Sequence, residues 1–324
     1  MRRFKKILVV CDGQSGFENA FDRVAWFART NGAEVTLIDV IETAEGDLAR
    51  RFSALPGARG HEIKDHVIDV RRARLDALAA PLRAQDIPVR STVQMGIPFI
   101  QIIRRVLREG HDLVVKGAQC ASARPFLGGP DMHLMRKCPC PVWVLNSSAE
   151  ARARHILAAV APDPEDRVRN GLNRTILELA TSLARQDGAR LDVLNAWELP
   201  EESTLRHSLA RVPAEQVDQL VAAEERQSAW RLHLLTADFA RDSDMMRVLH
   251  IKGAAADMIA EHVEAEGIDT IVMGTVARTG VGGFFIGNTA ETVLNRVSAS
   301  VLAVKPGGFV SPVTLDRITE GART

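Results

Sequence analysis

The chain has 324 residues, a formal net charge of zero from 41 basic and 41 acidic residues, and only 5% aromatic residues. Its length is that of about two ordinary domains, each large enough to bury a hydrophobic core. The balanced charge and sparse aromatics argue against nucleic acid as a partner. No apolar run approaches the roughly 18 residues of a membrane span, and the apolar run after the basic N-terminus is too short for a signal peptide. We therefore expect a cytoplasmic protein.

The first half alternates apolar strands with amphipathic helices. Residues 6–11 (KILVVC) form a continuous apolar run, which is typical of a parallel strand buried on both faces. A helix is expected over residues 16–30, and Asn31-Gly32 resembles a C-cap that ends it. Further strands are predicted at residues 34–40, 89–94, 112–116 and 142–145, and further helices at residues 62–85 and 97–108.

The second half repeats this order. HDLVVKG at residues 111–117 corresponds to IDTIVMG at residues 268–274, and CPVWVL corresponds to ASVLAV. A single repeat of about 150 residues indicates two fused domains and not a solenoid. Strands are predicted at residues 155–160, 190–196, 246–251, 269–273 and 300–304, and helices at residues 172–185, 214–241, 255–266 and from Gly287.

The alternation of strands and helices sets the fold class. Such strands pair in parallel through right-handed crossovers. We predict an α/β fold with two tandem, doubly wound parallel sheets of five strands each. The expected units are a first domain over residues 1–148, a second over residues 149–310 and a C-terminal tail over residues 311–324. In such sheets ligands bind beyond the carboxyl ends of the strands, where the strand order reverses.

A glycine-rich segment follows the fourth strand of the second half. Gly274 is followed after two residues by Ala277 and, after nine more, by Gly287-Asn288-Thr289, where a helix begins. Amides of such a loop and of a helix N-terminus favour phosphate groups. The alternative is an ordinary strand-to-helix connection that uses glycine only for its turns.

This spacing resembles the nucleotide loop of the universal stress protein family, which is Gly, two residues, Gly, nine residues, Gly, then Ser or Thr. The chain departs from it at Ala277 and at Asn288, with Thr289 one place later. The segments GTVARTG and GNTAE are most similar to the tandem, E-type members. The resemblance covers nearly the whole chain. It implies the Rossmann-like, adenine nucleotide alpha hydrolase-like fold, with the two halves related by a pseudo-twofold axis through their last strands.

The resemblance also implies ATP or ADP in the second half, with Mg²⁺ as its companion ion. The family's Asp after the first strand aligns with Ala161, and Asp163 reaches that place only if its loop is longer. Carried over by position, the binding residues are Ala161, Asp163, Ala196 and Gly253 for the adenosine, and Gly274, Ala277, Gly287, Asn288 and Thr289 for the phosphates.

The first half keeps less of this pattern. Asp12 and Gly96 hold their places after the first and third strands. The loop after the fourth strand has lost the spacing, because Gly117 is followed at three residues by Cys120, and Pro130 removes an amide donor near the helix start. We expect this half to bind no ATP and to act as a structural partner or to hold another ligand.

Four cysteines, Cys11, Cys120, Cys138 and Cys140, all lie in the first half. We interpret them as reduced thiols that fill a core. A metal site that adds His133 is the alternative. The CPC sequence lacks the two-residue gap of a zinc knuckle, however, and no second knuckle accompanies it. We therefore predict no metal site.

Catalysis finds little support in the sequence. There is no P-loop or GxSxG elbow, and the loop after the fourth strand of the second half has no Lys to neutralise a transferring phosphate. We expect no catalytic residues and at most slow ATP hydrolysis. The halves would form an intrachain pseudo-dimer, and a homodimer is an open alternative.

Two function classes remain. One is a stress-response regulatory protein that holds ATP or ADP. The other is a carrier or adaptor for an amphipathic, lipid-like molecule or a protein partner. The second class would use an apolar pocket over the sheet, unless its lining residues simply pack as an amphipathic helix. That lining would be Leu205, Leu209, Val217, Leu220 and Val221.

Overall fold

The computed structural model describes residues 4–12, 18–42, 59–118, 129–146, 149–207, 212–242, 244–275 and 287–315. The predicted residues Ala277, Cys120 and Leu209 lie outside these ranges. The strands of the first half are β1 (Lys6–Val10), β2 (Glu34–Glu42), β3 (Val89–Gly96), β4 (Leu113–Gly117) and β5 (Val142–Leu145). Its helices are α1 (Glu18–Asn31), α3 (Arg59–Arg83), α4 (Pro98–Glu109) and α5 (Gly129–Lys137).

The second half follows the same order with one additional helical segment. Its strands are β6 (His155–Ala159), β7 (Arg190–Trp197), β8 (Met246–Lys252), β9 (Thr270–Gly274) and β10 (Ser300–Val304). Its helices are α6 (Arg167–Asp187), α7 (Glu202–His207), α8 (Ala214–Thr236), the 3-10 helix η1 (Ala237–Asp242), α9 (Ala255–Glu266) and α10 (Asn288–Arg296).

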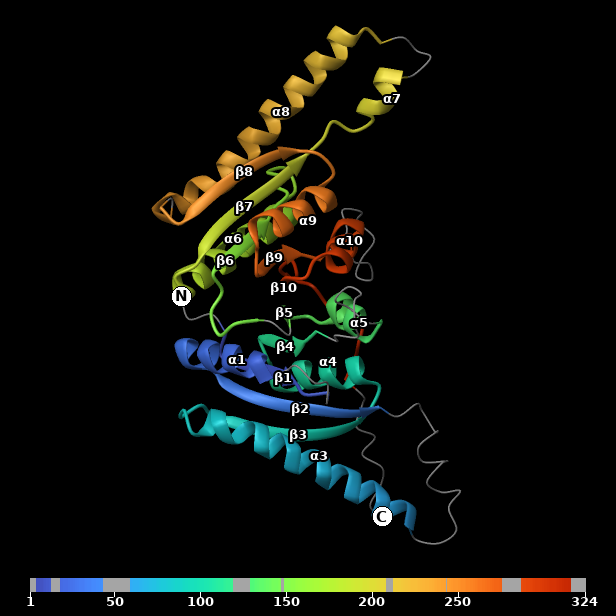
Figure 1. Cartoon of the computed structure of the whole chain (residues 1–324). Helices are drawn as coiled ribbons and strands as arrows, with labels where there is room; N and C mark the ends of the chain where they lie inside the picture. The colour runs from blue at the N-terminus through green and yellow to red at the C-terminus, as the bar shows by residue number, and fades with distance from the viewer. Residues whose placement is uncertain are drawn as a thin grey trace.

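The strands form one continuous sheet in the order β3-β2-β1-β4-β5-β10-β9-β6-β7-β8 (Figure 1). Each half contributes five parallel strands in a doubly wound order, as predicted. The halves meet where β5 pairs with β10 in antiparallel register, with Leu302 opposite Trp143. The two predicted sheets are therefore joined edge to edge through their last strands. We call this β5–β10 junction the seam.

Helices cover both faces of the sheet, which explains the uninterrupted apolar runs of its central strands. The core on one face receives side chains from α1, α3, α6 and α8. The core on the other face receives them from α4, α5, α9 and α10. Each half thus has helices on both faces of its own strands, and the two half-cores are continuous across the seam. In the described part of the chain, no helix is long and apolar enough to cross a membrane.

Two helix boundaries differ from the sequence-based prediction by five residues, more than any other. Helix α6 begins at Arg167 rather than at residue 172, because the Asp166 carboxylate caps it by accepting a hydrogen bond from the Arg169 amide at 3.0 Å. The long helix predicted over residues 214–241 ends at Thr236 and gives way to η1. The segment after β10 returns to the first half, where the Arg104 side chain donates to the Thr314 carbonyl at 3.2 Å.

Candidate functional site

The predicted phosphate residues lie at the carboxyl end of β9, beside the first turn of α10. Gly274 is the last residue of β9, and the Gly287 amide donates to the Thr275 carbonyl at 3.2 Å, which fixes the start of α10 there. Gly287 is the N-cap of α10 and has no capping side chain. Among the described residues, no acceptor meets the first-turn amides of Asn288 and Thr289. These amides and the helix dipole form a positive pole at this edge of the sheet.

A buried lysine bonds to the residue that holds the start of α10. Lys305 follows β10 and is 9% exposed, and its ammonium donates to the Thr275 hydroxyl at 2.6 Å. Burial lowers the pKa of Lys305 to about 8, and Cys138 opposes part of that shift. The group is therefore mostly cationic at neutral pH. The loop after β9 contains no lysine of its own, and Lys305 comes from the end of the next strand.

The first half contributes a second basic group. Arg136 of α5 donates to the Glu291 carboxylate in the first turn of α10 at 3.0 Å. An acidic side chain in a first turn stabilises the helix, but it also opposes a bound anion. The ion pair with Arg136 offsets that negative charge. No local pattern indicates this contact, because its partners come from different halves.

The residues predicted to contact adenosine have intramolecular partners. The Asn173 side chain donates to the Ala161 carbonyl at 2.8 Å and accepts from the Ala161 amide at 2.9 Å. Asp163 forms an ion pair with Arg169 at 2.7 Å. Asn173 is buried, and sequence analysis did not identify its role. It secures the turn after β6, where the family's Asp would otherwise be placed.

Two glycines of the predicted site have conformational or packing reasons of their own. Gly253 has a φ of +148°, and Gly96, which follows the third strand of the first half, has a φ of +134°. Both positions favour glycine whether or not a ligand binds. A Cβ on Gly274 would lie 2.8 Å from the Leu172 side chain of α6. Gly274 therefore allows α6 to approach the sheet closely.

The remaining predicted residues share one edge of the sheet. Ala161 follows β6, Ala196 lies near the end of β7, and Gly253 follows β8. Because β9, β6, β7 and β8 are neighbouring parallel strands, these positions line the same carboxyl edge as Gly274. The structure thus brings most of the predicted residues to one edge, with Asp163 engaged by Arg169.

The corresponding edge of the first half carries an ion pair. Asp12 follows β1, and its carboxylate lies 2.8 Å from the ammonium of Lys116 near the end of β4. Lys116 is buried, and the repeat aligns it with Met273, an apolar residue. The acidic group that the family resemblance assigns to adenosine is therefore neutralised internally in this half.

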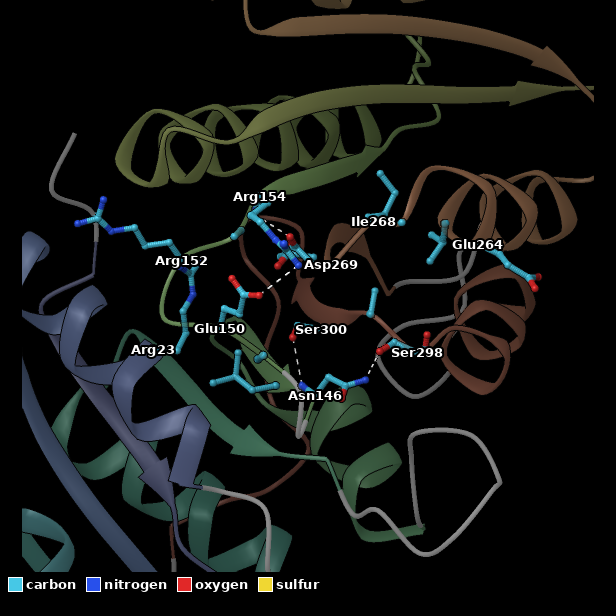
Figure 2. A pocket seen from close by; sticks show the side chains of 17 residues that line it. Arg23, Asn146, Glu150, Arg152, Arg154, Glu264, Ile268, Asp269, Ser298 and Ser300 are labelled. Atoms are coloured by element: carbon cyan, nitrogen blue, oxygen red, sulfur yellow. Dashed lines mark hydrogen bonds and ion pairs between the residues drawn. The ribbon is translucent and has the colours of Figure 1, made fainter.

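A cavity of about 490 Å³ lies at the seam (Figure 2). It is lined by the linker and by the amino ends of β9 and β10, so it lies at the opposite edge of the second half from Gly274. The Asp269 carboxylate accepts from the Arg154 amide at 2.7 Å, and Glu150 pairs with Arg154 at 3.1 Å (Figure 2). The Arg23, Glu150 and Arg154 side chains of its lining form ion pairs, and we assign the cavity to linker packing.

The predicted apolar pocket is not formed as expected. Val217 of α8 is fully buried, whereas Leu220 is 47% exposed. The side chains therefore do not face one interior space, and the segment behaves as an amphipathic helix. Cys11, Cys138 and Cys140 are buried free thiols, as predicted. Within the described ranges, no group of three His, Cys, Asp or Glu side chains could hold a metal ion.

Comparison with known proteins identifies the family. The profile of the Universal stress protein family matches residues 3–146 and 153–305. The chain belongs to this family. Universal stress protein E of Escherichia coli K12 is 28% identical over 98% of this chain and 98% of its own length. Universal stress protein E of Photorhabdus laumondii is 25% identical over 97% of this chain and 98% of its own. The tandem arrangement is thus shared with these universal stress proteins.

Solved structures share the fold of this universal stress protein. A Pseudomonas aeruginosa PAO1 protein of unknown function has a TM-score of 0.70 at 23% identity, with 94% of each chain covered. A universal stress protein from Archaeoglobus fulgidus has a TM-score of 0.64 at 17% identity, with 93% of this chain and 98% of that chain covered. At these identities the likeness establishes the α/β fold and the tandem domains.

Proposed function

We propose that this universal stress protein is a stress-response regulator that binds ATP or ADP in its second half. The phosphates would lie against the first turn of α10, beside Gly274. The observation that carries the proposal is the position of that turn. Its N-cap Gly287 donates to the Thr275 carbonyl at the end of β9, and the hydroxyl of the same threonine accepts from the buried Lys305 ammonium. Doubly wound sheets bind their ligands at this edge.

The donors at this edge fit a phosphate group in charge and in kind. Helix amides supply directed hydrogen bonds, and Lys305, bonded to Thr275 at the end of β9, supplies a positive charge. The only acidic side chain in the first turn of α10 is Glu291, which Arg136 neutralises. Mg²⁺ would be held mainly by the phosphate oxygens, since the described residues supply no acidic cluster for it.

The same edge supports binding better than turnover. Hydrolysis needs a group that positions or deprotonates the attacking water. Asp163 is engaged by Arg169, and Glu291 is engaged by Arg136. We infer that the nucleotide acts as a bound regulator, hydrolysed slowly if at all. Adenosine would lie toward Ala196 and Gly253, over the ends of β7 and β8.

Substitution at Gly287 tests the proposal with calorimetry. Gly287 has φ −63° and ψ 142°, which any residue can adopt, so an aspartate there is expected to cap α10 and leave the fold intact. Its carboxylate would occupy the first-turn amides and repel phosphate. Losing two charge-assisted hydrogen bonds of about 1.5–3 kcal/mol each weakens ATP binding roughly a hundredfold to ten-thousandfold.

Two variants control for steric effects and for added charge. Gly287→Ala adds a Cβ without a charge and is expected to keep ATP affinity within a few fold. Gly129→Asp places the same charge at the first residue of α5 in the other half, and is expected to change nothing. Equal ATP affinity in wild type and Gly287→Asp would disprove the assignment. Lack of affinity in all four proteins would favour the carrier or adaptor class instead.

A further inference from the structure

Two thiols lie close together just before β5. The Sγ atoms of Cys138 and Cys140 are 3.6 Å apart, and the chain bends at Pro139 and Cys140 between them. Cys138 is fully buried and Cys140 is 9% exposed. The pair forms at the end of α5, where the Cys138 amide still donates to the Leu134 carbonyl at 2.9 Å. The helix end thus fixes one thiol, and β5 fixes the other.

The seam brings a cation to this pair. In the β5–β10 register Ala303 lies opposite Val142, and continuing that register places Lys305 opposite Cys140. The Lys305 ammonium donates to Thr275 and lies 5.0 Å from the centre of the Phe309 ring. Cys138 raises the pKa of Lys305 against the larger effect of burial. A thiolate formed at the pair would therefore be stabilised by this ammonium.

The arrangement occurs at one end of the seam only. The repeat aligns Cys140 with Ala299 and Lys305 with Asn146. At that other end, the Asn146 amide donates to the Ser300 hydroxyl at 3.1 Å, and its side chain donates to the Ser298 carbonyl. Packing of the two last strands thus requires neither a thiol nor a lysine, since an alanine and an asparagine serve at the equivalent place.

We propose that Cys138 and Cys140 form a redox-active dithiol that a hydroperoxide converts to an intrachain disulfide, with Lys305 stabilising the reacting thiolate. The dithiol chemistry needs no bound nucleotide, although Lys305 also belongs to the proposed phosphate site. The hydrogen bond with Cys138, together with burial, raises the pKa of Cys140 well above its usual value. One sulfur attacks as the thiolate, and the other remains a thiol until the disulfide forms.

The reaction balances with peroxide as the oxidant. The thiolate attacks one peroxide oxygen and the O–O bond breaks, which gives a sulfenic acid and a hydroxide ion. The hydroxide takes the first thiol proton and becomes water. The second sulfur then attacks the sulfenic sulfur. The S–S bond forms, the S–O bond breaks, and the oxygen leaves with the second thiol proton as another water. Two electrons pass from the sulfurs to the peroxide.

Peptide mapping of the full-length protein tests the proposal. The folded protein is treated with hydrogen peroxide, unfolded in N-ethylmaleimide, digested with trypsin and analysed by mass spectrometry, with and without dithiothreitol. The expected product is an unalkylated peptide that starts at Cys138 and is two hydrogens lighter than the dithiol. Reduction with dithiothreitol followed by a second treatment with N-ethylmaleimide is expected to convert it to the dialkylated form. Cys140→Ser is expected to give no such peptide and to accumulate the sulfenic acid, trapped by dimedone.

The lysine role needs a kinetic readout. Lys305→Met is expected to slow disulfide formation about tenfold or more at neutral pH. The control Lys116→Met removes another buried lysine of the sheet and is expected to leave the rate unchanged, with circular dichroism used to check that both variants fold. A wild-type protein in which both thiols remain alkylatable after peroxide would overturn the site. So would a sulfinic acid or an intermolecular disulfide as the main product. An equal rate in Lys305→Met would overturn the role of the lysine.

Discussion

A buried ion pair across the two halves is expected to contribute strongly to the stability of the folded chain. Arg23 of α1 and Asp187 of α6 are 2.6 Å apart, with 2% and 0% of their side chains exposed. The same carboxylate accepts from Trp26 at 3.0 Å and from the Ala153 amide at 2.9 Å. Burial lowers the pKa of Arg23, and Asp187 is the main group that opposes this shift.

Asp187→Ala would leave the Arg23 guanidinium buried without its counter-ion. Removing one partner of a buried pair costs about 3–5 kcal/mol, and two further donors lose their acceptor. We expect the free energy of unfolding in urea to fall by about 4 kcal/mol at pH 7. The double variant Arg23→Met/Asp187→Ala should recover part of the loss, because no unpaired charge remains.

The control for this experiment is an ion pair of the same length at the surface. Arg174 and Asp238 are also 2.6 Å apart, but 55% and 56% of their side chains are exposed. Asp238→Ala should therefore cost less than about 1 kcal/mol. If Asp187→Ala costs no more than Asp238→Ala, burial does not determine the strength of the inter-half pair, and our reasoning is wrong.

Two further predictions concern the second half. Burial would raise the pKa of Asp192, but hydrogen bonds from Arg247 and His262 outweigh the effect of burial and lower the pKa. The Asp192 carboxylate therefore stabilises the fold fully above the ordinary Asp pKa of about 4, and this stabilisation is lost as the pH falls below that value. The destabilisation by Asp192→Asn, measured by urea titration, should shrink as the pH falls from 4 toward 2; a destabilisation that grows over this range would contradict the prediction. Gly253→Ala, at φ +148°, should lower the free energy of unfolding by about 1–3 kcal/mol. Gly171→Ala lies inside α6 with no atom near its added Cβ, and it should raise the free energy of unfolding by up to about 1 kcal/mol. If Gly253→Ala were the more stable of the two variants, the conformational argument would be refuted.

The layout of the fold could be predicted from sequence because it depends on local patterns. Apolar runs such as residues 142–145 and 300–304 indicated strands with their correct limits. The repeat then fixed the equivalence of the halves, and the last strands were expected at the seam, where β5 pairs with β10. The start of α6 was missed because the capping signal of Asp166 lies before the amphipathic pattern begins.

The candidate site was less predictable because its decisive contacts are long-range. Lys305 reaches Thr275 from the following strand, and Arg136 reaches Glu291 from the other half. A motif reports only the residues within its own loop. The Gly253 position illustrates the converse, since a glycine assigned to the ligand by resemblance is also required by a positive φ. The order of strands and the register, not the motif, brought these groups together.

Photoaffinity labelling with 8-azido-ATP most directly tests the claim that one nucleotide binds in the second half. The full-length protein would be irradiated with the label, digested and mapped by mass spectrometry, with excess ATP as the competitor. Our account predicts one label per chain, on peptides from residues 155–305, that ATP displaces and Gly287→Asp abolishes. Competable labelling confined to residues 4–146, or labelling that survives in Gly287→Asp, would contradict it.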